Sequence, residues 1–212
     1  MSIVKLNNRG VRSATTFGSI SGLGEMRFIK KQTASSSATI SFVDGTSDVV
    51  LDNTYKEYLF TFNNIHPETD NTIFKFNGSI DSGSNYNVAK TTTSFDAFHS
   101  EADDATLLHY NTSHDLAQGT GVSTLLRDIG NGNDESASGY LRLFNPSSTT
   151  FVKHFISEGS SYQHQSIAIH QFNAGYFNTT SAIDEIRFQL SNIGTPITLG
   201  SGTFKLYGIK DS

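Results

Sequence analysis

The chain has 212 residues, of which 36% are hydrophobic and only 17% are charged, and its net charge is −5. It contains no cysteine, which excludes a disulfide framework, a thiolate zinc site and a cysteine nucleophile. No segment approaches about 18 consecutive apolar residues, and the N-terminus lacks an apolar signal region. The sequence therefore predicts neither a membrane span nor a recognisable secretion signal.

Small polar and aromatic residues dominate the composition. Ser and Thr together contribute 51 residues and Asn contributes 16. Their side chains compete for backbone hydrogen bonds, so they disfavour helices and suit turns and exposed strand faces. Sixteen Phe and eight Tyr supply the apolar surface for a core. This composition predicts an all-β protein.

Basic charge is concentrated at the N-terminus. Residues 1–31 contain six basic side chains and one acidic side chain, whereas the other 181 residues contain nine basic and nineteen acidic side chains. A basic arm on an acidic body is suited to bind an acidic neighbour, including another copy of the chain. A solvated basic tail is the alternative. The arm forms no dense basic patch, so we expect no nucleic-acid partner.

We take residues 1–24 as an extended anchoring arm, because their glycines and few apolar residues cannot build a core. Residues 3–6 have the pattern of a short strand that could add to the sheet edge of a neighbour. Basic side chains beside them could pair with acidic groups. The candidate partner-binding residues of the arm are Ile3, Val4, Lys5, Leu6, Arg9 and Arg12.

Residues 25–212 show the period-2 alternation of short strands. The first predicted strands are 26–30, 38–43, 57–62 and 72–76, ended by the turn pairs Asp44-Gly45, Asn63-Asn64 and Asn77-Gly78. Residues 81–87 and 128–136 read as loops, and 95–99 and 105–110 fit either strands or a short helical turn.

Five further strands are predicted over 140–144, 150–156, 166–172, 185–190 and 202–209, with turns at Asn145-Pro146 and Glu158-Gly159. No long helix separates any of these strands, which excludes a parallel α/β sheet. We therefore predict one antiparallel, jelly-roll-like sandwich over residues 25–212.

No catalytic motif is present. The seven histidines form no H-x-H or H-E-x-x-H pattern, and the chain has no G-x-S-x-G elbow and no phosphate-binding loop. His109 and His114, beside Asp115, and His164 and His170 are most simply structural or surface residues. The acids Asp103 and Asp104 have no special spacing. We predict no catalytic residues, no metal and no cofactor.

Two loop clusters could supply oxygen ligands to calcium, although neither has the spacing of an EF-hand. Their acidic and amide residues are also what β-turns require. The clusters are Asp128, Asn131, Asn133, Asp134 and Glu135, and Asp44, Asp48 and Asp52.

Carbohydrate binding is a further alternative, because exposed aromatic rings stack on sugar rings. Tyr86, Tyr110, Tyr162 and Tyr176 lie in or near predicted loops. The chain has no Trp, and these Tyr side chains also suit core or subunit-interface positions.

Three segments resemble a family of virion structural proteins from marine tailed phages of the cyanophage and pelagiphage type. They are Val4–Val11, Tyr140–Pro146 and Ser201–Ile209. The resemblance implies a jelly-roll body, display on the virion and a homo-oligomer, with a trimer favoured, that is anchored to other virion proteins through the arm. It supplies no catalytic residues and does not choose between tail, fibre and capsid shell.

The sequence thus leads us to expect a non-enzymatic structural protein of a phage virion. A carbohydrate-binding module that attaches to a host-surface glycan and a hydrolase on the same fold are the alternatives.

Overall fold

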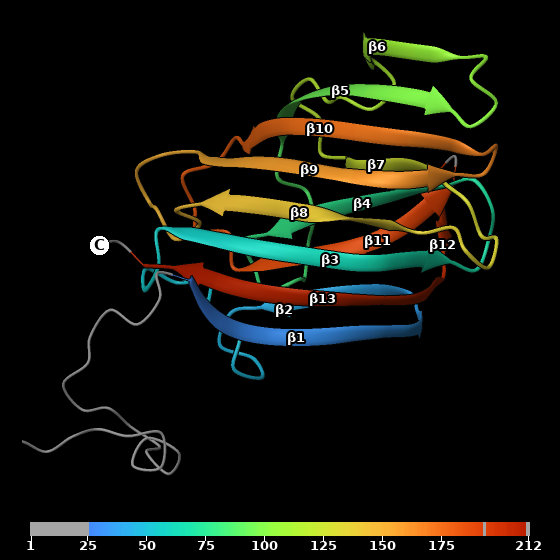
Figure 1. Cartoon of the computed structure of the whole chain (residues 1–212). Helices are drawn as coiled ribbons and strands as arrows, with labels where there is room; N and C mark the ends of the chain where they lie inside the picture. The colour runs from blue at the N-terminus through green and yellow to red at the C-terminus, as the bar shows by residue number, and fades with distance from the viewer. Residues whose placement is uncertain (1–25, 193, 211–212) are drawn as a thin grey trace, which may run out of the picture.

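A computed structural model describes residues 26–192 and 194–210 of the chain. These residues contain strands and loops and no helix, as the composition predicts (Figure 1). Within these two ranges, nothing has the length and apolarity of a membrane-crossing helix. The strands are β1 (Met26–Ser37), β2 (Thr39–Val43), β3 (Glu57–Pro67), β4 (Thr72–Ser79), β5 (Lys90–Ser100), β6 (Thr106–Tyr110), β7 (Ser123–Ile129), β8 (Ala137–Phe144), β9 (Lys153–Gln163), β10 (Ile167–Phe177), β11 (Glu185–Asn192), β12 (Thr195–Ile197) and β13 (Leu199–Ile209).

The strands form an antiparallel sandwich of two layers (Figure 1). The front layer has the order β1-β13-β3-β8-β9-β10-β5-β6. The rear layer has the order β7-β4-β11-β2, and β12 continues beside β11. One bridge, Ile129 to Gln163, connects β7 with β9. This arrangement confirms the predicted jelly-roll-like sandwich and makes the front layer about twice as wide as the rear one.

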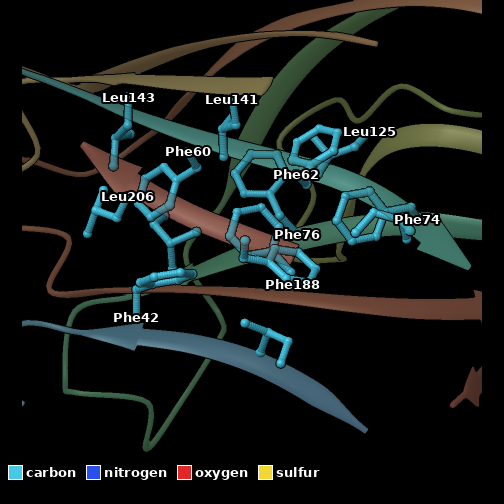
Figure 2. Packing of buried hydrophobic residues seen from close by; sticks show 14 of the residues in the cluster. Phe42, Phe60, Phe62, Phe74, Phe76, Leu125, Leu141, Leu143, Phe188 and Leu206 are labelled. Carbon is cyan, nitrogen blue, oxygen red and sulfur yellow. The ribbon is translucent and has the colours of Figure 1, made fainter. Parts of the chain in front are cut away.

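Phenylalanine rings fill the space between the layers, and Figure 2 shows their packing. Alternation along β3 points Tyr58, Phe60 and Phe62 inward, and each is at most 1% exposed. Phe188 of β11 lies at the centre of the cluster. Its ring centroid is 5.4–6.3 Å from the rings of Phe42, Phe60, Phe62, Phe74 and Phe204.

The interior becomes polar where β7 ends the rear layer. The side-chain amide of Asn173 donates to the Leu125 carbonyl at 3.0 Å, and Gln171 Oε1 accepts from the backbone N–H of Arg127 at 3.0 Å. Both amide side chains come from β10 and are buried. Two side chains therefore satisfy backbone groups at the edge of β7 that no neighbouring strand reaches.

Two predicted turns are instead strand positions. Asn77-Gly78 lies inside β4, and Glu158-Gly159 lies inside β9. A Cβ on Gly78 would sit 2.8 Å from the Phe177 ring, and one on Gly159 would sit 2.8 Å from the Ser138 carbonyl. Each glycine lets neighbouring elements approach closely, which explains why a glycine stands at this position inside a strand.

The region between residues 81 and 138 contains three strands. The ambiguous segments 95–99 and 105–110 form the β5–β6 hairpin, and β7 was not predicted. β3 also continues past Asn63-Asn64, because Asn64 adopts a φ of 53° in an irregularity that lets the strand run on to Pro67. The turns at Asp44-Gly45 and Asn145-Pro146 are confirmed.

Phe188→Ala should remove the central ring of the core. We expect a loss of about 3–5 kcal/mol in the free energy of unfolding, because burial and ring contacts disappear and a cavity remains. Urea denaturation measures the loss as a lower midpoint at an unchanged slope. Phe151→Ala is the matched control. Its ring is 68% exposed, so its effect should stay within about 0.5 kcal/mol; equal losses in both variants would contradict this view of the core.

Candidate binding face of the front layer

The outer face of the front layer, which is the side turned away from the rear layer, carries one row of large side chains. Tyr110 of β6 lies opposite Phe95 of β5, and Phe95 lies opposite Phe172 of β10. Phe172 in turn lies opposite Glu158 of β9, which lies opposite Tyr140 of β8. Residues opposite each other on antiparallel strands have Cβ atoms about 4.5–5.5 Å apart, so the five side chains form a continuous row. We call them the outer row.

Burial along the strands places this row on the outer face. Asp96, Gln171 and Leu141 follow or precede members of the row, and all three are fully buried between the layers. Successive side chains of a strand point to opposite faces. The outer row therefore faces away from the core, and its five side chains are half-buried or exposed.

At the aromatic end of the row, the rings of neighbouring strands stack on each other. The rings of Phe95 and Phe172 are 5.0 Å apart and nearly parallel, with an interplanar angle of 11°. The His170 ring lies 4.2 Å from Phe172. Phe95 is 42% exposed and Tyr110 is 47% exposed. Several adjacent exposed aromatic rings are typical of a surface that meets a ligand or a partner.

The polar end of the row is an oriented carboxylate. The Tyr140 hydroxyl donates to Glu158 Oε2 at 2.6 Å, and His170 Nε2 lies 2.9 Å from Oε1 of the same carboxylate. The Tyr140 hydrogen bond, more than the His170 contact, holds the pKa of Glu158 below its usual value. Glu158 is thus ionised at neutral pH and fixed in orientation beside the Phe172 ring.

Two shallow hollows flank the row. One has a volume of about 390 Å³ and is lined partly by Ser138, Ser160 and Tyr162. The other has a volume of about 440 Å³ and is lined partly by Ile156 and Tyr176. The first hollow presents hydroxyl groups and the second is mostly apolar. The face therefore offers rings, hydroxyls and a carboxylate within a small area.

A second group of ionisable side chains lies between the layers beneath Phe95. Asp96 is fully buried, and its Oδ2 accepts from Arg127 Nε at 2.7 Å. Arg127 also pairs with Asp128, and His109 Nδ1 lies 3.5 Å from Asp96 Oδ1. One guanidinium therefore holds both carboxylates. This arrangement favours fixed ion pairs over the proton transfer that a hydrolase would need.

The histidines lie in separate places. His170 belongs to the outer face, and His109 contacts Asp96. His114 Nδ1 is 3.4 Å from the Thr124 hydroxyl, and burial is the main cause that lowers the pKa of His114. His164 lies in the turn between β9 and β10.

Two acids of one loop cluster, Asp44 and Asp52, accept hydrogen bonds from backbone groups of their own loop. Asp44 Oδ1 accepts from the Leu51 N–H, and Asp52 Oδ1 accepts from the Thr54 N–H, each at 2.8 Å. In the described part of the chain, no three His, Asp or Glu side chains come together as metal ligands.

The four tyrosines weighed for sugar binding do not all lie in loops. Tyr110, Tyr162 and Tyr176 belong to β6, β9 and β10, where alternation turns all three to the outer face. Tyr86 lies in the β4–β5 loop, where its hydroxyl donates to buried Glu185 at 2.6 Å. Each of these three tyrosines lies at or next to the end of its strand, so the expectation that they lie in or near loops holds, and strand alternation adds the face on which they lie.

The candidate residues of the arm, Ile3, Val4, Lys5, Leu6, Arg9 and Arg12, lie outside the described residues. Other functional candidates, Phe95, Glu158 and Phe172, were missed. The sequence indicates them only as large or charged residues at alternate strand positions, and this pattern does not show that they lie side by side.

Comparisons of the chain with protein-family models, curated proteins and solved structures give no significant match. The function must therefore be argued from the sequence and the geometry of this molecule.

Lys90 is a buried lysine that the outer face does not use. Its Nζ donates to Asn77 Oδ1 at 2.7 Å and to the Val88 carbonyl at 3.1 Å, and the residue is 0% exposed. Burial lowers the pKa of Lys90 to about 8. Because solvent does not reach the amine, we interpret it as a structural group.

Lys90→Met should change how stability depends on pH. Between about pH 8 and pH 10 the unfolded chain keeps the Lys90 proton and the folded protein releases it, so the wild type gains stability as pH rises. Relative to the variant, we expect a gain of at most about 1.4 kcal/mol for each pH unit in this window. Urea denaturation of both proteins across the window measures it. Parallel pH curves would contradict the lowered pKa of Lys90.

Proposed function

We propose that the protein is a non-enzymatic structural protein of a tailed-phage virion, attached through residues 1–24 and displayed on the particle. The observation that carries the proposal is the outer face, whose continuous row of rings and one carboxylate forms a broad contact surface. The resemblance of residues 4–11, 140–146 and 201–209 to marine phage virion proteins supports the same role. The all-β sandwich is consistent with it.

The buried ion pairs also favour a role in binding. Asp96 and Asp128 are held by Arg127, and the amine of Lys90 is enclosed by its hydrogen-bond acceptors. Asp96 and the Lys90 amine are both fully buried, so neither meets a ligand at the surface. The outer face, by contrast, offers exposed rings and an oriented carboxylate that can meet another molecule.

Purified virions test the main proposal. We expect mass spectrometry to detect the full-length protein in particles, and gold-labelled antibodies to place it on the tail, a fibre or the capsid shell. Deleting residues 1–20 should leave a folded body that is no longer incorporated, because the arm provides the attachment. Absence from purified particles would contradict the virion role, and equal incorporation of the truncated protein would contradict anchoring by the arm.

The outer row also favours a second candidate function, the binding of a host-surface carbohydrate. A sugar ring has an apolar C–H face that can stack on Phe95 and Phe172, and hydroxyl groups that can donate to the adjacent Glu158 carboxylate. An aromatic ring beside an oriented carboxylate thus matches both sides of a sugar. On a displayed virion protein, this binding would attach the particle to its host.

Glycan arrays probed with the full-length protein test this candidate. Phe95→Ala should weaken binding about tenfold or more, because burial of one aromatic ring against a ligand contributes about 1.5–3 kcal/mol. Glu158→Gln should weaken it by a similar factor, because hydrogen bonds to a charged acceptor contribute about 1.5–3 kcal/mol. Phe28→Ala is the matched control, since Phe28 is 59% exposed on the distant strand β1. No glycan bound by the wild type, or an equal loss in Phe28→Ala, would contradict the carbohydrate site.

A further inference from the structure

Strand β6 is an open edge of the front layer. Among the described residues it pairs with β5 alone, and Figure 1 shows it at one end of the layer. Leu108 on its outer face is 71% exposed, and Leu107 on the opposite face is 49% exposed. An edge strand with apolar side chains on both faces is a template for pairing with another strand.

The hydrogen bonds of the β5–β6 hairpin identify which groups of β6 are free. Asn111 N–H donates to the Ser94 carbonyl at 2.8 Å, and Ser100 N–H donates to the Ala105 carbonyl at 2.9 Å. Hydrogen-bonded pairs alternate along an antiparallel ladder, so the odd-numbered residues of β6 turn their backbone groups toward β5. The N–H and carbonyl of Leu108 therefore point to the open side.

The opposite edge of the same layer is protected, and β6 is not. β1 carries Arg27, Lys30 and Lys31, and its pairing with β13 shifts register between Phe28 and Lys30. Basic side chains and bulges are devices that prevent edge-to-edge pairing. The segment Thr106–Tyr110 has no Lys, Arg or Pro, and its register with β5 is continuous. Of these two edges, β6 is the one suited to accept a strand.

The charges around β6 indicate which segment pairs with this edge. Residues 97–126 contain four carboxylates and no Lys or Arg, and Glu101, Asp103 and Asp104 directly precede β6. Residues 1–24 contain Lys5, Arg9 and Arg12 and no acidic residue. The acidic hairpin and the basic arm are therefore complementary in sign.

We propose that β6 accepts residues 3–6 from the arm of a second copy of this chain. Ile3, Val4 and Leu6 supply the apolar side chains of the added strand, and the basic residues of the arm meet the acids beside β6. This inference rests on the proposed function, in which residues 1–24 attach the protein, and it identifies β6 as the strand to which they attach. The arm leads into β1, which lies at the far end of the front layer from β6, so the contact joins opposite ends of successive molecules. Head-to-tail contacts of this kind build rings or open chains.

The absence of native cysteine makes a crosslinking test direct. Full-length Leu6→Cys and Leu108→Cys proteins, given different mass tags, are mixed and oxidised, and the mixed dimer is measured on non-reducing gels and by mass spectrometry. Adjacent antiparallel strands hold opposite Cα atoms about 4.5–5.5 Å apart, within the range that a disulfide spans. Val4→Cys is tested in parallel, because residues 4 and 6 share one face of a strand. Phe151→Cys replaces Leu108→Cys as the control, since Phe151 is equally exposed but lies in the β8–β9 loop.

We expect the mixed dimer of Leu6→Cys or Val4→Cys with Leu108→Cys to exceed the Phe151→Cys control several-fold. Its yield should fall when salt rises from about 0.05 to about 0.5 M, because salt screens the exposed charges. A yield no higher than the control overturns the proposal. Dominant dimers of Leu108→Cys with itself would instead indicate pairing between two β6 strands, and they overturn it too. A double variant that carries both Leu6→Cys and Leu108→Cys is oxidised in parallel. A crosslink that forms only within this double variant, and never between chains, also overturns the proposal.

Leu108→Pro tests the pairing of the arm with β6 independently of the proposed virion role. Proline removes the N–H that points to the open side and leaves the hydrogen bonds to β5 in place. We expect an unchanged urea midpoint and at least tenfold weaker self-association in sedimentation. If this variant self-associates like the wild type, β6 is not the acceptor. If it loses self-association while the wild type is absent from purified virions, the acceptor stands and the virion role fails.

Discussion

The edge of β7 faces β10 across the sandwich, and side chains satisfy it in place of a further strand. Asn173 donates to the Leu125 carbonyl, and Gln171 accepts from the Arg127 N–H. Buried backbone groups must be paired, so this edge would otherwise require another strand in the rear layer. The two amides let a rear layer of four strands close against a front layer of eight. The unequal widths of the two layers therefore depend on side chains that take the place of a further rear strand.

Beyond β7, no rear strand among the described residues covers the front layer. The interior at this end changes from phenylalanine rings to the Arg127 ion pairs and the amide contacts. β6 then extends as an edge with both faces accessible, which explains why Leu107 and Leu108 are exposed. The outer row has a different origin, because it lies on the side turned away from the rear layer and follows from the register of five adjacent front strands.

Much of the fold was readable in the sequence where alternation was strong. Tyr58, Phe60 and Phe62 mark β3, and the buried face of the strand follows from their spacing. The pattern failed at β7, whose residues Ser123–Ile129 are mostly buried on both sides and show no alternation. It also failed at Gly78 and Gly159, because a glycine that marks a turn and a glycine that permits close packing look alike in sequence. The candidate site could be predicted only in part. His170 and Tyr110 were noticed as residue types, but nothing local indicates that they lie on one face.

The sequence alone determined the class of the protein: strands instead of helices, a phenylalanine core, no cysteine chemistry, and a basic leader before an acidic body. These properties are sums over residues or short-range periodicities, and they do not need the positions of distant segments. Only the tertiary structure decided that Tyr110, Phe95, Phe172, Glu158 and Tyr140 form a row and that β6 lies at an open edge. Strand order and register join residues far apart in the chain, and long-range pairing of this kind leaves no mark in any single segment.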